Sequence, residues 1–302
     1  MALLTVKDVS KQYKDKKAVD RVSFELHDHT CVALLGPNGA GKTTILRCLA
    51  QLLHPTSGTI SYKNGNASDD RRSHIGYLPQ YPDFYGWMSG FEFLVYSGKL
   101  ANMDKKEVMN RADELLQLVG LSEAKNKKVR TYSGGMKQRL GIAQAIIHRP
   151  NILMLDEPVS SLDPIGRREV LELMEQLKQE MTIIFSTHIL SDADEISDEL
   201  LLLHEGKVIE SGRLTDLRNT YKTEMIELEF DGDVEFYKQA LEHIPSVKEA
   251  SIVRNTVHIQ VEDVHKARKV IFATSNENDW PLTSFSVNRA SLEDMFMKAV
   301  EK

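Results

Sequence analysis

Residues 31–44, CVALLGPNGAGKTT, contain the pattern that predicts the fold of most of this chain. The stretch opens with five consecutive apolar residues, Cys31 to Leu35, which are typical of a strand buried on both faces of a sheet. A helical pattern then begins at Thr44 and continues to Leu53, close to Pro55. The glycine-rich segment between them is therefore a turn from a strand into a helix, which indicates an α/β fold.

Two further apolar runs extend the same architecture. Residues 152–155 and 182–185 are predicted to be buried strands, and a helical stretch from Val170 to Glu180 lies between them. Strand, helix and strand in this order predict a parallel sheet with crossover helices, which binds ligands at the carboxyl ends of its strands. Residues 88–150 carry mostly helical patterns, so we expect a helical subdomain inserted into the α/β body.

The distribution of charge indicates a second domain. Residues 221–302 contain 10 Lys and Arg against 15 Asp and Glu, whereas residues 1–220 contain 28 against 29. We therefore expect a larger domain over residues 1–220 and a smaller one over 221–302. In the smaller domain we expect strands at 225–230, 251–253, 257–261 and 282–287, and helices at 234–243 and 264–273. This βαββαβ order is that of an α+β, ferredoxin-like domain. A last helix should follow, with Ser291 as its N-cap residue.

The composition excludes several classes of protein. The 302 residues carry a net charge of −6, without the basic footprint of a nucleic-acid binder, so no nucleic-acid partner is expected. The longest apolar run has five residues, whereas a membrane-spanning helix needs about 20, and the first residues carry no secretion signal. Cys31 and Cys48 cannot form a disulfide framework, which indicates a reducing, cytoplasmic compartment. A small basic cluster at Lys14, Lys16 and Lys17 is interpreted as solvated surface.

The glycine-rich turn matches the pattern G-x-x-x-x-G-K-[ST], between a strand and a helix as that motif requires. Glycines let the backbone approach phosphate oxygens closely, and the N–H groups and helix N-terminus then face the anion. The cation of Lys42 suits the β- and γ-phosphates of a nucleotide, and the Thr43 hydroxyl suits Mg²⁺, which prefers oxygen ligands. The motif comprises Gly36, Pro37, Asn38, Gly39, Ala40, Gly41, Lys42 and Thr43.

Two more motifs place polar groups where this sheet would bind its ligand. Residues 153–158, LMLDEP, are an apolar strand that ends in two carboxylates. We expect Asp156 to hold Mg²⁺ through water, and Glu157 to orient or polarise the attacking water. Residues 132–139, YSGGMKQR, place Ser-Gly-Gly before a helix that runs to about His148. The N-terminal amides of that helix form a second anion site.

In this combination and order, the motifs resemble those of the ATP-binding subunits of ABC transporters, over residues 1 to about 220. The resemblance implies a P-loop ATPase cassette that uses ATP with Mg²⁺. It implies that Tyr13 stacks on adenine, that Thr44 joins the ATP-binding residues, and that Gln80 contacts Mg²⁺ and water. The implied metal-binding residues are Thr43, Gln80 and Asp156, and the implied catalytic residues are Lys42, Glu157 and His188, the last contacting the γ-phosphate.

The same resemblance implies a homodimer of ATPase subunits. Each chain would contribute its signature, Ser133, Gly134 and Gly135, to the γ-phosphate of the ATP bound by the other subunit. Asp163 would belong to a D-loop that crosses the interface. The chain departs from the family pattern at Tyr132, where Leu is commonest, and at Ser161, where Gly is frequent. Neither departure removes a group that donates a hydrogen bond to phosphate, and neither removes a carboxylate.

Such a subunit works with an integral-membrane permease on a separate chain, which would hold it peripherally on the inner face of the cell membrane. The family binds its permease just after the position of Gln80, and aromatic residues gather there in this chain. They are Tyr81, Phe84, Tyr85, Trp87, Phe91, Phe93 and Tyr96. Aromatic residues are favoured anchors at interfaces. The alternative is that several of them fill the core of the helical subdomain.

The end of the chain narrows the prediction. Residues 291–296, SLEDMF, resemble the tail of ATPases from the ABC-2 group, many of which serve bacterial exporters. The main prediction is therefore a subunit that hydrolyses ATP to ADP and phosphate and thereby powers export. Two alternatives stay open, a soluble ABC ATPase without a permease and the ATPase of an importer.

Overall fold

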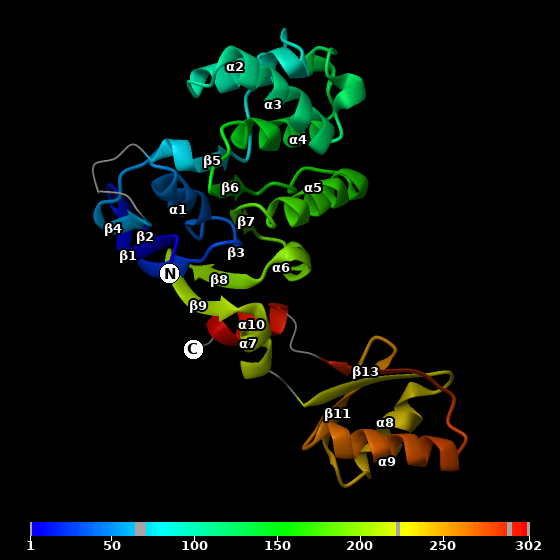
Figure 1. The fold of residues 1–302 in the computed structure, drawn as a ribbon. Coiled ribbons are helices and arrows are strands. Elements are labelled where there is room, and N and C mark those ends of the chain that lie inside the picture. The colour runs from blue at the N-terminus through cyan, green and yellow to red at the C-terminus, as the bar shows by residue number, and fades with distance from the viewer. Residues whose placement is uncertain (1, 64–70, 222–223, 289–291, 301–302) are drawn as a thin grey trace. The chain divides into compact units, whose positions relative to one another are not determined.

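The computed structural model describes residues 2–63, 71–221, 224–288 and 292–300 (Figure 1). Its contacts divide the chain into two compact units, Met1–Leu214 and Thr215–Lys302. The division falls at the start of α7 (Leu214–Thr220), whereas the change in charge placed the boundary at the end of that helix. The two units have separate hydrophobic clusters of buried residues.

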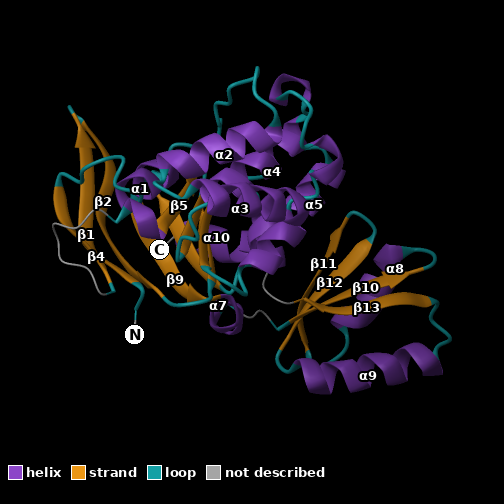
Figure 2. Ribbon diagram, turned by 45° about the horizontal axis from the view of Figure 1, so that its top comes forward, coloured by secondary structure: helices purple, strands orange, loops and turns teal. Residues whose placement is uncertain are grey.

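A six-stranded sheet forms the centre of the first unit (Figures 1 and 2). Its order is β5-β6-β7-β3-β8-β9; all neighbours up to β8 are parallel, and β9 is antiparallel to β8. The strands span Ile75–Leu78 (β5), Ile152–Asp156 (β6), Thr182–Thr187 (β7), Cys31–Leu35 (β3), Glu199–His204 (β8) and Lys207–Arg213 (β9). Every residue of β3, β6 and β7 is buried. The parallel sheet predicted from these apolar runs is confirmed.

The register of the sheet brings the carboxyl ends of its central strands together. Leu35 at the end of β3 lies opposite Thr187 of β7, and Asp156 at the end of β6 lies opposite Ser186 of β7. The segments that leave these strands carry the glycine-rich turn, the paired carboxylates and His188. The sheet topology therefore brings together polar side chains that are distant in the sequence.

A second sheet, of three antiparallel strands, has no counterpart in the sequence-based prediction. Its order is β2-β1-β4, with β1 at Leu4–Tyr13, β2 at Lys16–Leu26 and β4 at Ser57–Tyr62. Register shifts interrupt both ladders, so the alternation of buried and exposed residues is irregular. Its apolar side chains share one core with β3, β6 and the helix α1 (Lys42–Leu49), which anchors the start of that helix beside the central sheet.

The helix α1 is shorter than predicted. It ends at Leu49, although Leu52 and Leu53 continue the apolar pattern. Gln51 adopts a left-handed backbone with a φ of 57°, and the amides of Leu52 and Leu53 donate to the carbonyl of Arg47. A left-handed residue with such bonds is a common way to end a helix.

Three helices lie together as the helical subdomain in Figure 1: α2 (Gly90–Leu100), α3 (Lys105–Leu118) and α4 (Gly134–Ala145). A capping box fixes the start of α2, because the Ser89 hydroxyl accepts from the Glu92 amide at 3.2 Å and the Glu92 carboxylate accepts from the Ser89 amide at 2.7 Å. Short 3₁₀ turns occupy Arg72–His74, Ser122–Ala124 and Val129–Thr131. The helices α5 (Pro164–Leu177) and α6 (Leu190–Ile196) connect the parallel strands.

The second unit contains an antiparallel sheet of order β11-β12-β10-β13. Its elements are β10 (Met225–Phe230), α8 (Val234–Glu242), β11 (Val247–Val253), β12 (Thr256–Val261), α9 (Val264–Glu277), β13 (Leu282–Asn288) and α10 (Leu292–Val300). The predicted βαββαβ order is present. β11 begins at Val247 rather than at Ser251, because Val247 and Glu249 pair with β12 across a register shift. The predicted N-cap residue Ser291 lies outside the described residues.

Candidate active site

The turn between β3 and α1 follows a path that requires glycine at two positions. Gly41 has a φ of 105°, and a Cβ at this residue would come within 2.4 Å of the carbonyl oxygen of Ala18. A Cβ at Gly36 would come within 2.3 Å of the carbonyl oxygen of Leu203. Both clashes are with backbone atoms, which cannot move aside as the end of a side chain would. The glycines therefore fix how closely the turn packs against its neighbours.

Lys42 is held inside this turn. Its side chain is 5% exposed, and Nζ donates to the carbonyl oxygens of Gly36 at 2.7 Å and Pro37 at 3.2 Å. Burial lowers the pKa of Lys42, while the nearby carboxylate of Glu157, 3.6 Å from Nζ, acts in the opposite direction. The ammonium group is therefore fixed at one place in the turn rather than mobile in solvent.

Asp156 at the end of β6 has one satisfied and one unsatisfied oxygen. Its Oδ1 accepts hydrogen bonds from the Thr43 hydroxyl at 3.0 Å and from the Ser186 hydroxyl at 2.7 Å. Its Oδ2 is buried and has no hydrogen-bond partner within the described part of the chain. A buried carboxylate oxygen without a donor is costly unless a cation or water meets it. With the Thr43 hydroxyl beside it, this oxygen fits a hard divalent cation.

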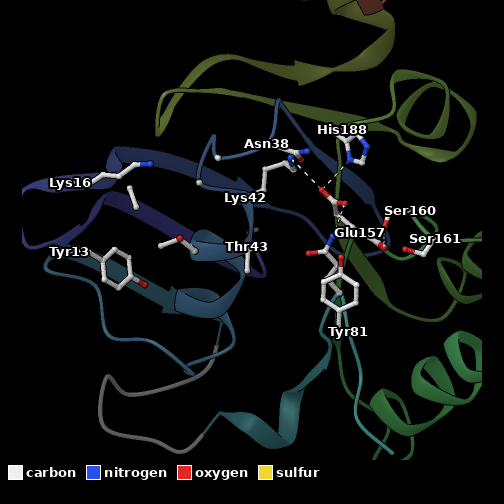
Figure 3. A pocket seen from close by; sticks show the side chains of 15 residues that line it. Tyr13, Lys16, Asn38, Lys42, Thr43, Tyr81, Glu157, Ser160, Ser161 and His188 are labelled. Carbon is white, nitrogen blue, oxygen red and sulfur yellow. Dashed lines mark hydrogen bonds and ion pairs between the residues drawn. The ribbon is translucent and has the colours of Figure 1, made fainter.

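Glu157 is the point at which the predicted side chains converge (Figure 3). Gln80 donates from Nε2 to Oε2 at 3.1 Å, and Nδ1 of His188 lies 3.1 Å from Oε1. Oε1 is also the atom 3.6 Å from Nζ of Lys42. The backbone of Glu157 is left-handed, with a φ of 48°, which is uncommon for a residue with a side chain. Four segments of the sequence thus supply one cluster around a carboxylate that is only 9% exposed.

Most of the predicted ATP-binding residues line one pocket of about 710 Å³, a size usual for small-molecule sites (Figure 3). In the figure, Tyr13 and Glu157 lie on opposite sides of Thr43. The lining residues are Tyr13, Lys16, Ala18, Asn38, Gly39, Gly41, Lys42, Thr43, Thr44, Gln80, Tyr81, Glu157, Ser160, Ser161 and His188. The other predicted residues of the motif belong to the same turn but are not among the residues described as lining the pocket; they are Gly36, Pro37 and Ala40. Asp156 reaches the pocket through its bond to Thr43.

The signature residues are absent from the described lining of that pocket. Ser133 and Gly134 are exposed at the start of α4, where the Ser133 hydroxyl accepts from the amide of Met136 at 3.2 Å. Asp163 caps α5 by accepting from the amide of Gly166 at 2.8 Å. A Cβ at Gly135 would lie 3.7 Å from Cα of Gly166, so the first turns of α4 and α5 are in close contact. These residues form a separate cluster of helix N-termini.

Several residues at or beside the site were not assigned to it from the sequence, among them Lys16, Tyr81 and Ser186. Lys16 lines the pocket, although its basic cluster was interpreted as solvated surface. Tyr81 also lines the pocket, although it was grouped with the aromatic residues expected to contact a permease. Ser186 lies two residues before His188, but its partner Asp156 is 30 residues away in the sequence, so only the sheet register could have identified that contact.

Comparison with known families gives two matches. A family described as ABC transporter matches residues 19–160. A second family, described as the C-terminal domain of ATP-binding proteins like DrrA1-3, matches residues 212–300. The first match lies within the first compact unit, and the second match nearly coincides with the second unit.

Individual relatives share nearly the whole length of the chain. YxlF, an uncharacterized ABC transporter ATP-binding protein of Bacillus subtilis, is 43% identical over 300 residues. The alignment covers 99% of this chain and 99% of YxlF. The bacitracin transport ATP-binding protein BcrA of Bacillus licheniformis is 34% identical, over 99% of this chain and 97% of BcrA.

Solved structures resemble the larger part of the chain. The ATP-binding subunit of an ABC transporter superposes with a TM-score of 0.65 at 32% identity, over 72% of this chain and 93% of that chain. The ATP-binding cassette MJ0796, described as a dimer in a post-hydrolysis state bound to ADP and Pi, superposes with a TM-score of 0.63 at 26% identity. That likeness covers 70% of this chain and 98% of the cassette.

Proposed function

This chain belongs to the family of ABC transporter ATP-binding proteins, and from that membership we propose that it hydrolyses ATP in the pocket of Figure 3 to power export through a membrane permease carried on a separate chain. The observation that carries the proposal is the convergence of Gln80, Lys42 and His188 on the carboxylate of Glu157. Two acidic residues at the solvated end of a strand would not need these three partners.

We assign the chemistry of hydrolysis to this cluster. Glu157 acts as the general base that polarises the attacking water, and Gln80 and His188 hold its carboxylate in place. Lys42, fixed by the carbonyls of the turn, stabilises charge on the β- and γ-phosphates, and His188 contacts the γ-phosphate. The products are ADP and inorganic phosphate. Contacts within the chain already orient these groups around the Glu157 carboxylate.

We assign Mg²⁺ to Thr43, Gln80 and Asp156. Bound there, Mg²⁺ neutralises negative charge on the phosphate oxygens. The assignment is supported by the buried Oδ2 of Asp156, which lacks a hydrogen-bond donor among the described residues, and by the Thr43 hydroxyl that bonds to the same carboxylate. ATP with Mg²⁺ is the general requirement of the family.

A homodimer would complete each site. The signature residues Ser133, Gly134 and Gly135 and the D-loop residue Asp163 form a cluster outside the lining described for the chain's own pocket. Two copies in a head-to-tail arrangement would bring the N-terminus of α4 to the γ-phosphate of the other copy's ATP, where its amides favour negative charge. The similarity to a cassette described as dimeric supports this arrangement.

Export is inferred from the relatives. BcrA is described as a bacitracin transport protein, and its similarity extends over both units of this chain. Within the described ranges, no helix is both long enough and apolar enough to cross a membrane. We propose that the chain binds its permease at the inner face of the membrane.

The aromatic residues after Gln80 differ in their surroundings, and the exposed Trp87 suits a permease contact. Phe93 is 3% exposed and belongs to the subdomain core, and the half-buried Phe84 packs edge-on against it, with 5.2 Å between ring centroids. Trp87 is 67% exposed, and its neighbour Tyr85 lies 6.1 Å away between ring centroids. A large exposed aromatic residue is the kind of anchor that dominates an interface.

Trp87→Ala is expected to weaken binding to the permease by about 30-fold, the effect of losing about 2 kcal/mol at an interface anchor. The ATPase rate of the isolated chain should stay at the wild-type level, because Trp87 is not among the residues that line the pocket. The measurement is recovery of a polytopic membrane protein with the tagged chain from detergent-solubilised membranes of its host. Met109→Ala, which shortens a 42% exposed side chain of α3, is the matched control.

The same purification tests the proposed function against its alternatives. A polytopic membrane protein that copurifies with the wild-type chain supports the permease. Recovery with ribosomes instead would favour a soluble ABC ATPase. If Trp87→Ala lost ATPase activity together with its fold, the side chain would be part of the core and the assignment of this surface would be wrong.

Tyr13→Ala is expected to raise the KM for ATP by at least about fivefold, because stacking a base on an aromatic ring is worth about 1–3 kcal/mol. Tyr13 is 47% exposed at the edge of the pocket, so its removal should leave the fold intact. Tyr13→Phe keeps the ring and should keep the wild-type KM in steady-state ATPase assays. Equal KM values for the Ala and Phe variants would exclude stacking.

A further inference from the structure

The hydroxyl of Ser186 bridges the two carboxylate residues at the end of β6. Ser186 is 0% exposed and lies opposite Asp156 in the β6–β7 register. Its Oγ accepts a hydrogen bond from the backbone amide of Glu157 at 2.9 Å and donates one to Oδ1 of Asp156 at 2.7 Å. Ser186 is absent from the lining described for the pocket, so its contacts act on the site from behind.

The first bond stabilises an uncommon backbone. Glu157 turns into the left-handed region, with a φ of 48°, immediately after the last pair of the β6–β7 ladder. Its amide has left the ladder but is still buried, and a buried amide without an acceptor is strongly unfavourable. The Ser186 hydroxyl is that acceptor. It therefore helps to hold the conformation that directs the Glu157 side chain toward Gln80, Lys42 and His188.

The second bond fixes which oxygen of Asp156 is available. Because Oγ of Ser186 accepts from an amide, its single proton is free to be donated to Oδ1 of Asp156. The Thr43 hydroxyl donates to the same oxygen at 3.0 Å. With both donors on Oδ1, the carboxylate cannot rotate without breaking them, and Oδ2 is the oxygen left without a donor among the residues described.

We propose that Ser186 is a positioning residue for ATP hydrolysis. Its bond to Asp156 would orient that carboxylate for Mg²⁺ when the ion is bound, and its bond to the Glu157 amide would orient the general base. The inference rests on the proposed function, because it assigns these two residues to metal binding and to base catalysis. Partners that orient a metal ligand are known to affect metal affinity or activity by about 10- to 100-fold.

The strand that holds Ser186 also offers a matched control. Thr182 begins β7, is 1% exposed, and its hydroxyl likewise bridges two groups. It accepts from the amide of His29 at 2.9 Å and donates to the carbonyl oxygen of His27 at 2.9 Å. Ser186→Ala and Thr182→Val therefore each delete one buried bridging hydroxyl from the same strand, at opposite ends.

The test combines turnover with binding, using the full chain. Ser186→Ala is expected to lower kcat by about 10- to 100-fold. Calorimetric titration with ATP should give the wild-type affinity in EDTA, but the gain in affinity on adding Mg²⁺ should shrink by about tenfold. Thr182→Val should keep both the kcat and the Mg²⁺ gain, and Ser186→Thr, which restores a hydroxyl, should recover most of the lost rate.

Two outcomes of this test would contradict the proposed role of Ser186. A wild-type kcat and Mg²⁺ gain in Ser186→Ala, or equal losses in Ser186→Ala and Thr182→Val, would overturn the inference. If Ser186→Ala does not fold, Ser186→Cys repeats the test, because it keeps the volume but offers only a weak donor and acceptor. Absence of ATP hydrolysis in the wild-type chain would contradict the proposed function, while the Mg²⁺-dependent binding would still test the role of Ser186.

Discussion

Glu157→Gln is expected to lower the ATPase rate by about 10²- to 10⁴-fold and to accumulate a dimer with ATP bound between its subunits. Glutamine has nearly the same shape as glutamate, so the turn after β6 should keep its conformation. The amide cannot accept the proton of the attacking water, and it removes the negative charge that lies 3.6 Å from Nζ of Lys42. ATP would then still close the dimer, but hydrolysis would no longer reopen it.

Light scattering after size exclusion measures this outcome directly. The Glu157→Gln variant should be dimeric with ATP and Mg²⁺ and monomeric with ADP. Glu205→Gln is a suitable control, because Glu205 is an exposed glutamate that also has a left-handed backbone, with a φ of 47°. A variant that stayed monomeric with ATP and Mg²⁺ would contradict the dimer, and one that kept the wild-type rate would remove Glu157 from catalysis.

Lys42→Ala is expected to reduce kcat by about 10²- to 10³-fold, the usual effect of removing one preorganised donor from a site where charge develops. Lys42 is 5% exposed and is fixed by the carbonyls of Gly36 and Pro37, so its charge acts in a poorly solvated place. Its removal also leaves the buried carboxylate of Glu157 without its nearest cation.

Lys16→Ala tests whether the burial of Lys42 is the reason for the large loss of kcat that is expected when Lys42 is removed. Lys16 lines the same pocket but is exposed, so solvent and salt screen its charge and a much smaller loss is expected. Phosphate release and binding of a fluorescent ATP analogue measure the two variants side by side. Equal losses in both would mean that net charge in the pocket, and not the fixed position of Lys42, supports the activity.

The sequence predicted those parts of the site in which one short motif determines both the backbone and the side chain. Asp156 and Glu157 follow an unbroken apolar run, so the strand end and the sheet edge could be identified together. Lys42 belongs to a turn whose glycines the structure requires. In each case the spacing of the motif and the apolar pattern beside it predict the same backbone conformation.

Other features depend on partners that are distant in the sequence. Ser186 precedes His188 by two residues, but its contact with Asp156 becomes evident only when β6 lies beside β7. Lys16 becomes part of the pocket only because β2 packs near the glycine-rich turn. A count of aromatic residues could not separate the buried Phe93 from the exposed Trp87. The small sheet of β1, β2 and β4 escaped prediction because register shifts disrupt its alternation.

The separation of the signature from the pocket has a kinetic consequence. In the proposed homodimer, a chain that carries half of each of two sites would be active only when two copies meet, so free subunits at low concentration would be limited by encounter rather than by chemistry. A permease that holds two copies side by side would replace bulk concentration by an effective concentration set by the tether, in the mM range for short links. The membrane partner would then act as a scaffold that raises the turnover of the ATPase, besides providing the path for the transported molecule.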